Sequence, residues 1–462
     1  MKIIILGSGP GGYVAALRAA QMGAEVTIVE EKEVGGTCLN EGCIPTKTLV
    51  ASAEAYSKAK DLASYGIDIT GEIKLNVKKI MERKNSVIST QVKGIRALFK
   101  SWGVTLKDGR GSFISEKQVR VVSKQGKEET LTADKFIIAT GVSQPSLPAF
   151  PFDGKQIISS SEALQIQEIP DSMLILGAGV MGCEFACIYR EFGTDVSMVE
   201  LMPRALSIED AEISQVLERE LKKKKIKLHA GVKAERVTTD ASGARAYLSD
   251  GKELFASKIL VTIGSRAFNT SGIGLEHVGV ELDKRGAIIV NEFMETSNKD
   301  IYAIGDVTGG LLLAYVASKQ GTCAVANIMG HKEKMDYNVI PVGIFTHPEI
   351  ASVGLREHQA QERGLKYKIG RFQYRALGKA HAMGEIAGMF KVIADTETNK
   401  LLGVHIIGHN AADIIHEAAV ALKAGMTAEA LADTVHAHPT LAEGLMEAAE
   451  DVMGRAIHVP KP

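Results

Sequence analysis

The chain has 462 residues, more than one hydrophobic core usually organises, so we expect about two to four domains. Its 54 Lys and Arg and 55 Asp and Glu are well mixed and leave a formal net charge of -1, which argues against nucleic acid or anionic membrane as partners. Five cysteines are too few for a secreted disulfide framework, and the chain shows neither a signal-peptide pattern nor an apolar run of spanning length. We therefore expect a cytoplasmic protein.

Residues 2–30 have the pattern of a dinucleotide-binding module. An apolar strand leads into a glycine loop, and an Ala-rich helix and a second strand then lead to Glu30. Gly7 allows the tight turn, Gly9 lets the backbone approach a pyrophosphate, and Gly12 lets helix and strand pack closely. The helix N-terminus favours phosphate, and Glu30 is placed to accept hydrogen bonds from a ribose.

The segment from Gly35 to Lys47 places Cys38 and Cys43 five residues apart directly after this module. An undistorted helix would separate such residues by about 7.5 Å along its axis, whereas a disulfide needs roughly 4.4 to 6.8 Å between alpha carbons. Gly42 permits unusual backbone angles and Pro45 removes a helical donor, so we expect a distorted helix start that holds the sulfurs close. The pattern favours a redox-active dithiol over two unrelated structural thiols.

The same module recurs over residues 173–200. Three glycines occupy the corresponding loop positions, Gly177, Gly179 and Gly182. The first glycine and the terminal acid are 23 residues apart in both copies. Two loops of one geometry imply two dinucleotides, the alternative being one vestigial copy. Cys183 and Cys187 lie four apart on the predicted helix and are interpreted as packing residues.

Position assigns the two nucleotides. The cofactor that exchanges electrons with sulfur should occupy the first module, which the cysteines follow at once, so the second module should hold the other dinucleotide. An acid at the end of the second strand favours a free ribose 2'-hydroxyl, whereas a 2'-phosphate favours arginine. Glu200 therefore predicts a dinucleotide without a 2'-phosphate, such as NAD rather than NADP. Arg204 could weaken that preference, but it is interpreted as a solvated surface charge.

After about residue 335 the glycine fingerprints stop. Alternating strand patterns and an Ala-rich amphipathic helix over 411–424 predict an antiparallel sheet with helices. The segment ends in a short motif with two histidines and an acid, His436-Ala-His438-Pro439-Thr-Leu-Ala-Glu443. Pro439 is expected to begin a helix, and His436 is interpreted as a surface histidine that caps one.

These segments together resemble the flavin-dependent disulfide oxidoreductases, and the resemblance covers nearly all of the chain. The form GGTCLNEGCIPTK is most similar to members that oxidise dihydrolipoyl groups. The resemblance implies FAD in the first module and NAD in the second. It implies an α/β fold of two Rossmann-like dinucleotide-binding domains and a C-terminal α+β dimerisation domain. The expected boundaries are 1–145 and 266–335 for the FAD-binding domain, 146–265 for the NAD-binding domain and 336–462 for the dimerisation domain.

The resemblance also implies roles for single residues. His438 is the catalytic base and Glu443 its partner; imidazole suits the deprotonation of thiols near pH 7, and a carboxylate orients the ring. Lys47 is expected near flavin N5, and Glu184 is expected as its carboxylate partner by the nicotinamide. Further cofactor contacts are expected at Gly111, Thr140, Gly141, Gly264, Asp306 and Ala314. Tyr315 stands where histidine is common in the family, and no metal site is expected.

The implied activity is oxidation of dihydrolipoyl groups with reduction of NAD. The dihydrolipoyl groups would be carried by lipoylated domains of 2-oxo acid dehydrogenase or glycine cleavage complexes, and the enzyme would be a homodimer. Mercuric reductases usually carry a further thiol pair near the C-terminus, and residues 453–462 contain no cysteine. Glutathione reductase-like chains usually prefer NADP and have paired acids where Glu443 is followed by Gly444. A mainly structural flavoprotein subunit also stays open.

Overall fold

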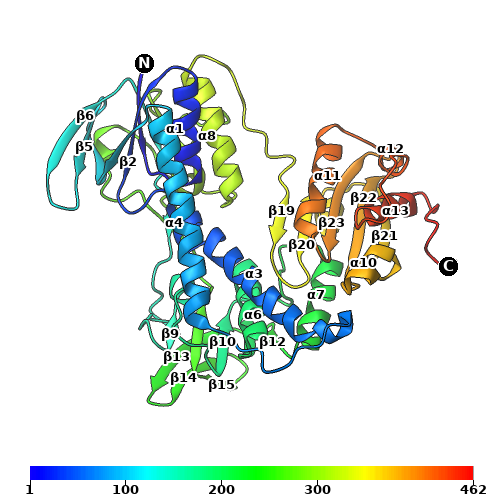
Figure 1. Ribbon diagram of the computed structural model, residues 1–462. Coiled ribbons are helices and arrows are strands. Elements are labelled where there is room, and N and C mark those ends of the chain that lie inside the picture. Colours follow the sequence, from blue (N-terminus) through cyan, green and yellow to red (C-terminus); the bar gives the residue numbers. More distant parts are fainter. Residues whose placement is uncertain (461–462) are drawn as a thin grey trace. The chain divides into compact units, whose positions relative to one another are not determined.

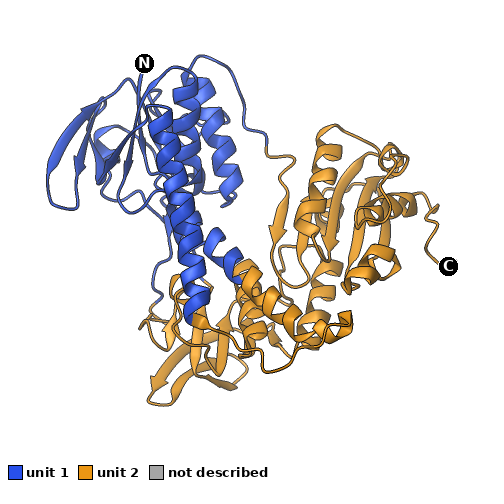
Figure 2. Ribbon diagram, viewed as in Figure 1, with its two compact units in different colours: residues 1–49, 78–147, 264–336 blue, residues 50–77, 148–263, 337–462 orange. Residues whose placement is uncertain are grey.

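The computed structural model describes residues 1–460, which form two compact units (Figure 2). Unit 1 comprises Met1–Leu49, Lys78–Leu147 and Gly264–Asp336, and unit 2 comprises Val50–Val77, Pro148–Ile263 and the chain from Tyr337 onward. Each unit contains one five-stranded parallel sheet with helices, so the expected α/β class is confirmed. Within residues 1–460 no helix is long and apolar enough to cross a membrane.

The parallel sheet of unit 1 has the order β18 (Ile301–Ala303), β7 (Lys135–Ile138), β1 (Lys2–Leu6), β2 (Glu25–Glu30) and β3 (Thr105–Asp108). Its central strands are continuous apolar runs because both faces are covered. One face packs on an antiparallel sheet of β4 (Arg110–Ser115), β5 (Gln118–Val122) and β6 (Glu128–Thr132), with Leu6 and Phe113 in one core cluster.

Helices α1 (Pro10–Gln21) and α8 (Ala314–Ile328) lie side by side in unit 1 (Figure 1). Their close approach depends on small residues. A Cβ on Gly321 would lie 2.7 Å from the Gly11 carbonyl oxygen, and one on Gly11 would lie 3.1 Å from the Ala317 carbonyl oxygen. The unit also contains α2 (Gly36–Glu41), the start of α3 (Cys43–Lys60) and nearly all of α4 (Val77–Ser101).

The parallel sheet of unit 2 has the order β12 (Lys227–Ala230), β11 (Asp195–Glu200), β10 (Ser172–Leu176), β16 (Lys258–Val261) and β9 (Ile157–Ile158). Helix α6 (Val180–Phe192) follows β10, and α7 (Ala211–Lys223) follows β11. The registers of the two modules correspond, since Lys2 pairs with Glu25 and Ser172 with Asp195. The repeated strand, loop, helix and strand are therefore confirmed, and Cys183 and Cys187 are buried on α6 as expected.

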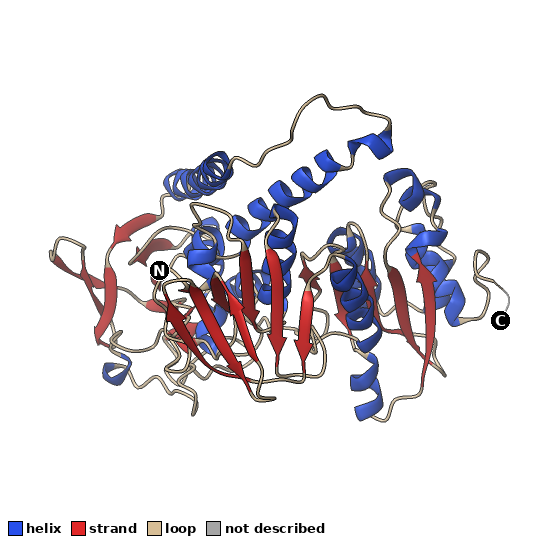
Figure 3. Ribbon diagram, turned by 90° about the horizontal axis from the view of Figure 1, so that it is seen from below, coloured by secondary structure: helices blue, strands red, loops and turns tan. Residues whose placement is uncertain are grey.

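The C-terminal part of unit 2 is a five-stranded sheet in the order β19 (Val342–Ile344), β20 (Ile350–Gly354), β23 (Leu401–Ile407), β22 (Met389–Asp395) and β21 (Tyr367–Gln373). All its neighbours are antiparallel, as expected. Helices α11 (Ala411–Lys423) and α13 (Glu443–Val452) share one core cluster with strand residues such as Phe390 and Val404. Figure 3 shows helices lying against the strands.

A buried cation on the opposite face of β22 joins this sheet to α7. The Lys391 side chain is fully buried, and its ammonium donates to Asp210 at 2.9 Å, Glu212 at 2.8 Å and Glu357 at 2.6 Å. A buried charge requires such partners, and loss of one typically costs about 3–5 kcal/mol. The network fixes the N-terminus of α7, and with it the end of the loop that follows Glu200.

Candidate active site

The two glycine loops have the same local geometry. The first glycine of each has a left-handed backbone, with φ of +98° in loop 7–12 and +106° in loop 177–182. A Cβ on the third glycine of either loop would lie 1.9 Å from the carbonyl oxygen of the first. A Cβ on Gly9 or Gly179 would meet no atom within 4 Å, so the second glycine leaves open space over the loop. Both loops fit a pyrophosphate.

Each terminal acid holds the glycine loop of its own module. One oxygen of Glu30 accepts from the Ser8 backbone N–H at 2.8 Å, and one oxygen of Glu200 accepts from the Ala178 N–H at 2.6 Å. The other oxygen of each accepts from the backbone N–H two residues further on, at 2.8 Å in both copies. An ionised carboxylate has about four acceptor positions, so both acids keep capacity for a ribose hydroxyl.

The dithiol lies at a break between two helices. Helix α2 ends at Glu41 and α3 begins at Cys43, while Gly42 has φ -140° and ψ -110°. A hydrogen bond with the Cys43 thiol, and then burial, raise the pKa of Cys38. The expected distortion at Gly42 and the close approach of the two sulfurs are thus present. Cys38 is half-buried and Cys43 is exposed.

This dithiol segment rests on the first glycine loop. The Gly35 N–H donates to the Ser8 carbonyl at 3.0 Å, and a Cβ on Gly36 would lie 2.7 Å from the Gly9 Cα. The two features that the sequence places next to each other are therefore also neighbours in space.

Two charged or polar side chains of unit 1 lie near the dithiol. The charge of Lys47 acts to lower the pKa of Cys38, against the larger effects that raise it. Burial, and then the charge of Cys38, raise the pKa of Tyr13, which projects from α1. The sequence analysis missed Tyr13, because an aromatic residue after a glycine loop carries no local signal of what it faces.

Asp306 follows β18 in a short 3-10 turn, as the strand and Gly-Asp pattern predicted. Burial raises the pKa of its carboxyl, while the charge of Arg266 acts to lower it. The turn is held by α8, since the Gly305 N–H donates to the Gln320 side-chain oxygen at 2.7 Å. Such a half-buried carboxylate fits a hydroxyl donor such as the ribityl chain. Arg266 and Gln320 are further residues that sequence patterns did not reveal.

Residues 140 and 141 are clamped by the returning chain. The Thr140 hydroxyl donates to the Asn269 carbonyl at 2.9 Å, and the Asn269 amide donates to the Thr140 carbonyl at 2.9 Å. The Asn269 N–H also donates to the Gly141 carbonyl at 3.1 Å. These bonds accompany the pairing of β8 (Val142–Ser143) with β17 (Ala267–Phe268). Asn269 therefore holds the backbone of residues 140 and 141 in place, and their contact with the cofactor stays a prediction.

The remaining three residues that were predicted to contact the cofactor differ in their surroundings. Gly264 has φ +106° and packs near Leu147. A Cβ on Gly111 would lie 2.7 Å from a methyl of Leu6, which gives this glycine a packing role beneath the first glycine loop. Ala314 is the first residue of α8, and the neighbouring Tyr315 is exposed.

Glu184 is buried on α6 and is not an exposed helix charge. One oxygen accepts from the Phe345 backbone N–H at 2.9 Å, directly after β19. The carboxylate is thereby oriented by the C-terminal sheet. Its predicted pairing with Lys47 by the nicotinamide stays a prediction.

His438 and Glu443 are paired in unit 2. The His438 Nδ1 lies 2.9 Å from one oxygen of Glu443, and the other oxygen accepts from the Thr440 N–H at 2.8 Å. Burial acts to raise the pKa of Glu443, but these hydrogen bonds lower it overall. The His438 side chain is 76% exposed, so an oriented imidazole is presented to solvent.

The local structure corrects the expectation for Pro439. Helix α13 begins at Glu443, four residues later, and the His438-Pro439 peptide is cis. The intervening residues form an irregular turn in which the Thr440 hydroxyl donates to the Ala437 carbonyl at 2.8 Å. Pro439 therefore shapes the approach to the helix rather than beginning it.

The interpretation of His436 as a surface histidine is also wrong. Its side chain is only 5% exposed, and its Nε2 lies 2.7 Å from Glu417 of α11. The ring Nδ1 lies 2.7 Å from the Thr434 carbonyl oxygen. The hydrogen bond with Glu417 raises the pKa of His436 in spite of its burial. His436 thus holds residues 436–443, the segment that carries His438, against α11.

This ion pair predicts a pH-dependent stability. Because the pKa of His436 is higher in the folded than in the unfolded chain, its stabilisation is complete below the unfolded value, about 6.5, and is lost as pH rises through the folded value. His436→Gln should therefore lower the thermal unfolding midpoint most at pH below about 6.5. The pair should contribute on the order of 1 kcal/mol. His331→Gln, at an exposed histidine, is the control. If the fall in the unfolding midpoint caused by His436→Gln grows toward alkaline pH, the ion pair between His436 and Glu417 is not the source of the stabilisation.

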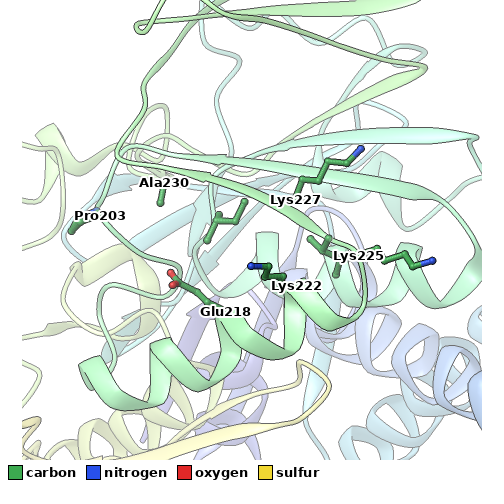
Figure 4. A pocket seen from close by; sticks show the side chains of 8 residues that line it. Pro203, Glu218, Lys222, Lys225, Lys227 and Ala230 are labelled. Atoms are coloured by element: carbon green, nitrogen blue, oxygen red, sulfur yellow. The ribbon is translucent and has the colours of Figure 1, made fainter.

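A cavity of about 500 Å³ lies in the second module (Figure 4). It is lined by Pro203, by Glu218 and two lysines of α7 and the turn after it, and by β12. None of the predicted cofactor-binding residues lines it.

Comparison with known proteins agrees with this arrangement. Residues 1–321 match the family model described as pyridine nucleotide-disulphide oxidoreductase, and residues 340–449 match the dimerisation domain of that family. A mitochondrial dihydrolipoyl dehydrogenase of Pisum sativum is 39% identical over 99% of this chain and 92% of its own length. The dihydrolipoyl dehydrogenase of Bacillus subtilis is 41% identical over 99% and 98%. The crystal structure of LpdA from Mycobacterium tuberculosis is 30% identical, covers 98% of this chain and 100% of its own, and superposes with a TM-score of 0.92.

Proposed function

Because the chain belongs to the pyridine nucleotide-disulphide oxidoreductase family, we propose that it is a dihydrolipoyl dehydrogenase, which oxidises protein-bound dihydrolipoyl groups and reduces NAD. Such enzymes use FAD and NAD. The observation that carries the proposal is the Cys38 and Cys43 pair at the break between α2 and α3, seated on a glycine loop that fits a dinucleotide.

We assign the protein groups as follows. His438, oriented by Glu443, takes a proton from a dihydrolipoyl thiol. The thiolate forms a bond to the Cys38 sulfur of the oxidised pair, and the Cys38–Cys43 bond breaks, which leaves Cys43 as a thiolate. The second lipoyl thiol then loses its proton to solvent, and its thiolate attacks the first lipoyl sulfur. The bond from that sulfur to Cys38 breaks with Cys38 as the leaving thiolate, which closes the lipoyl disulfide and leaves both electrons on the cysteines.

Cys43 is suited to carry the resulting negative charge, because it is the first residue of α3 and a helix N-terminus stabilises a thiolate. FAD, when bound, supplies the two-electron transfer between the dithiol and the nicotinamide. We assign its phosphates to loop 7–12, its ribose to Glu30, and its ribityl chain to Asp306. The NAD phosphates are assigned to loop 177–182 and its ribose to Glu200.

We also propose a cytoplasmic homodimer in which His438 serves the dithiol of the other subunit. The match of residues 340–449 to a dimerisation domain and the exposure of the His438 side chain support the dimer. Five cysteines in 462 residues are too few for a secreted disulfide framework, which fits a reducing compartment. Lipoylated carrier domains of 2-oxo acid dehydrogenase or glycine cleavage complexes are the proposed partners. For the chain itself we propose an FAD-binding domain of residues 1–145 and 266–335, an NAD-binding domain of residues 146–265 and a dimerisation domain of residues 336–462.

The test is turnover by the isolated FAD-loaded protein. Dihydrolipoamide with NAD should be oxidised rapidly, and NADH should reduce lipoamide. Glutathione disulfide or mercuric ion with NADPH should be poor substrates, because the chain lacks the sequence features of those reductases. Rapid turnover of glutathione disulfide would favour the related reductases instead. Slow turnover of all of them would favour a mainly structural flavoprotein.

A further inference from the structure

Arg204 follows Glu200 by four residues in the sequence, but its guanidinium turns into its own loop. Its Nη2 donates to the Ser207 carbonyl at 3.2 Å and to the Glu209 carbonyl at 3.3 Å. Its Nε is buried, and no hydrogen-bond partner for it is found within residues 1–460. The interpretation of Arg204 as a solvated surface charge is therefore wrong.

The loop around this guanidinium, residues 204–209, is closed by bonds of its own. The Ser207 hydroxyl donates to the Arg204 carbonyl at 2.7 Å. The Ala205 N–H donates to Glu218 of α7 at 2.9 Å, beside the cavity of Figure 4. The Glu209 carboxylate accepts from Arg356 at 2.8 Å. Both faces of the loop are thus anchored within unit 2.

Loop 204–209 in turn holds the second glycine loop. The Leu206 N–H donates to the Ala178 carbonyl at 2.9 Å, and the Cys183 thiol donates to the same oxygen at 3.3 Å. The Ala178 N–H donates to Glu200. Glu200 therefore fixes one side of the Ala178 residue, and the loop closed around Arg204 fixes the other.

The first module uses the same device without an arginine. There the Ser8 carbonyl accepts from the Gly35 N–H at 3.0 Å, and the Ser8 N–H donates to Glu30. In both modules the segment after the acid folds back onto the residue after the first glycine. In the second module that segment contains a cation of its own, which donates to two of its carbonyl groups.

We propose that Arg204 is a positioning residue for NAD, which acts by closing loop 204–209 against Ala178, and that it is not a ligand for a 2'-phosphate. Because the Arg204 Nη2 is engaged by two loop carbonyls, this nitrogen can turn to a phosphate only if the loop opens and Ala178 loses its support. NAD preference then depends on two features, the acid Glu200 and the engagement of Arg204 within its own loop. This inference rests on NAD being the nucleotide of the proposed function.

The test compares Arg204→Ala, Arg204→Lys and Glu200→Ala in the FAD-loaded protein, with NADH and NADPH as the probes. Reduction of the bound flavin by each nucleotide in rapid mixing gives an apparent dissociation constant and a limiting rate without any thiol substrate. Arg204→Ala should weaken both nucleotides alike, by roughly tenfold for charged hydrogen bonds of this kind, with an unchanged limiting rate. Arg204→Lys should share the defect, because an ammonium cannot reproduce the planar fork.

Glu200→Ala should instead change the ratio of the two apparent dissociation constants, because NADH binding should weaken roughly tenfold or more and NADPH binding should weaken less. A second readout is amide hydrogen exchange, which should quicken at loops 177–182 and 204–209 in both Arg204 variants. Arg219→Ala, an exposed arginine of α7, should leave every measurement unchanged.

Selective loss of NADPH binding in Arg204→Ala, with retention in Arg204→Lys, would show a phosphate ligand and overturn the proposal. Unchanged nucleotide binding and unchanged exchange in both variants would also overturn it. Failure of dihydrolipoamide as a substrate would leave these measurements interpretable, because none of them uses a thiol.

Discussion

His438→Gln is expected to slow flavin reduction by dihydrolipoamide by roughly 100- to 10,000-fold, the usual cost of losing a general base. Flavin reduction by NADH should be unchanged, because that half of the reaction removes no proton from a thiol. The effect should be largest near neutral pH, where thiols with a pKa near 8.5 are mostly protonated. Rapid mixing of the FAD-loaded variant with dihydrolipoamide, and separately with NADH, measures both halves.

Two further variants sharpen this test. Glu443→Gln should give a smaller defect of the same kind, because Glu443 orients the imidazole through a hydrogen bond of 2.9 Å. His331→Gln, at an exposed histidine of unit 1, should be silent. Normal reduction by dihydrolipoamide in His438→Gln would show that another group is the base.

Cys38→Ser and Cys43→Ser should each abolish lipoamide turnover but should differ in their spectra. If Cys43 lies against the flavin, the Cys38→Ser enzyme retains a lone Cys43 thiolate and shows a thiolate-to-flavin charge-transfer absorbance. The Cys43→Ser enzyme should lack this band. Absorbance spectra of the two oxidised variants, recorded as pH is raised, provide the measurement.

The structure gives a physical reason for the difference. Cys43 begins α3, where the helix N-terminus favours a thiolate, whereas burial and the hydrogen bond with Cys43 raise the pKa of Cys38. A substitution of Cys43 removes that hydrogen bond but leaves Cys38 half-buried. If Cys43→Ser rather than Cys38→Ser shows the charge-transfer absorbance, then Cys38 is the cysteine that lies against the flavin. Cys187→Ser, at a buried thiol of α6, is a control for the loss of a cysteine as such.

The features that the sequence determined by itself are local. Each nucleotide module is encoded within one short stretch, because the strand, the glycine turn, the helix and the acid are consecutive and their geometry depends on backbone angles and close packing. The break at Gly42 was predictable for the same reason, since the spacing of Cys38 and Cys43 is incompatible with a regular helix. The antiparallel C-terminal sheet followed from strand periodicity.

The features that only the tertiary structure decided join residues far apart in the chain. Asn269 clamps Thr140, Gln320 holds Gly305, and Phe345 orients Glu184, and no local pattern encodes these partners. His436 illustrates the reason, because its burial depends on Glu417 of another helix. Arg204 is a second example, because its side chain has several possible rotamers. The carbonyl groups that surround the side chain determine which rotamer it adopts, and its position after Glu200 does not.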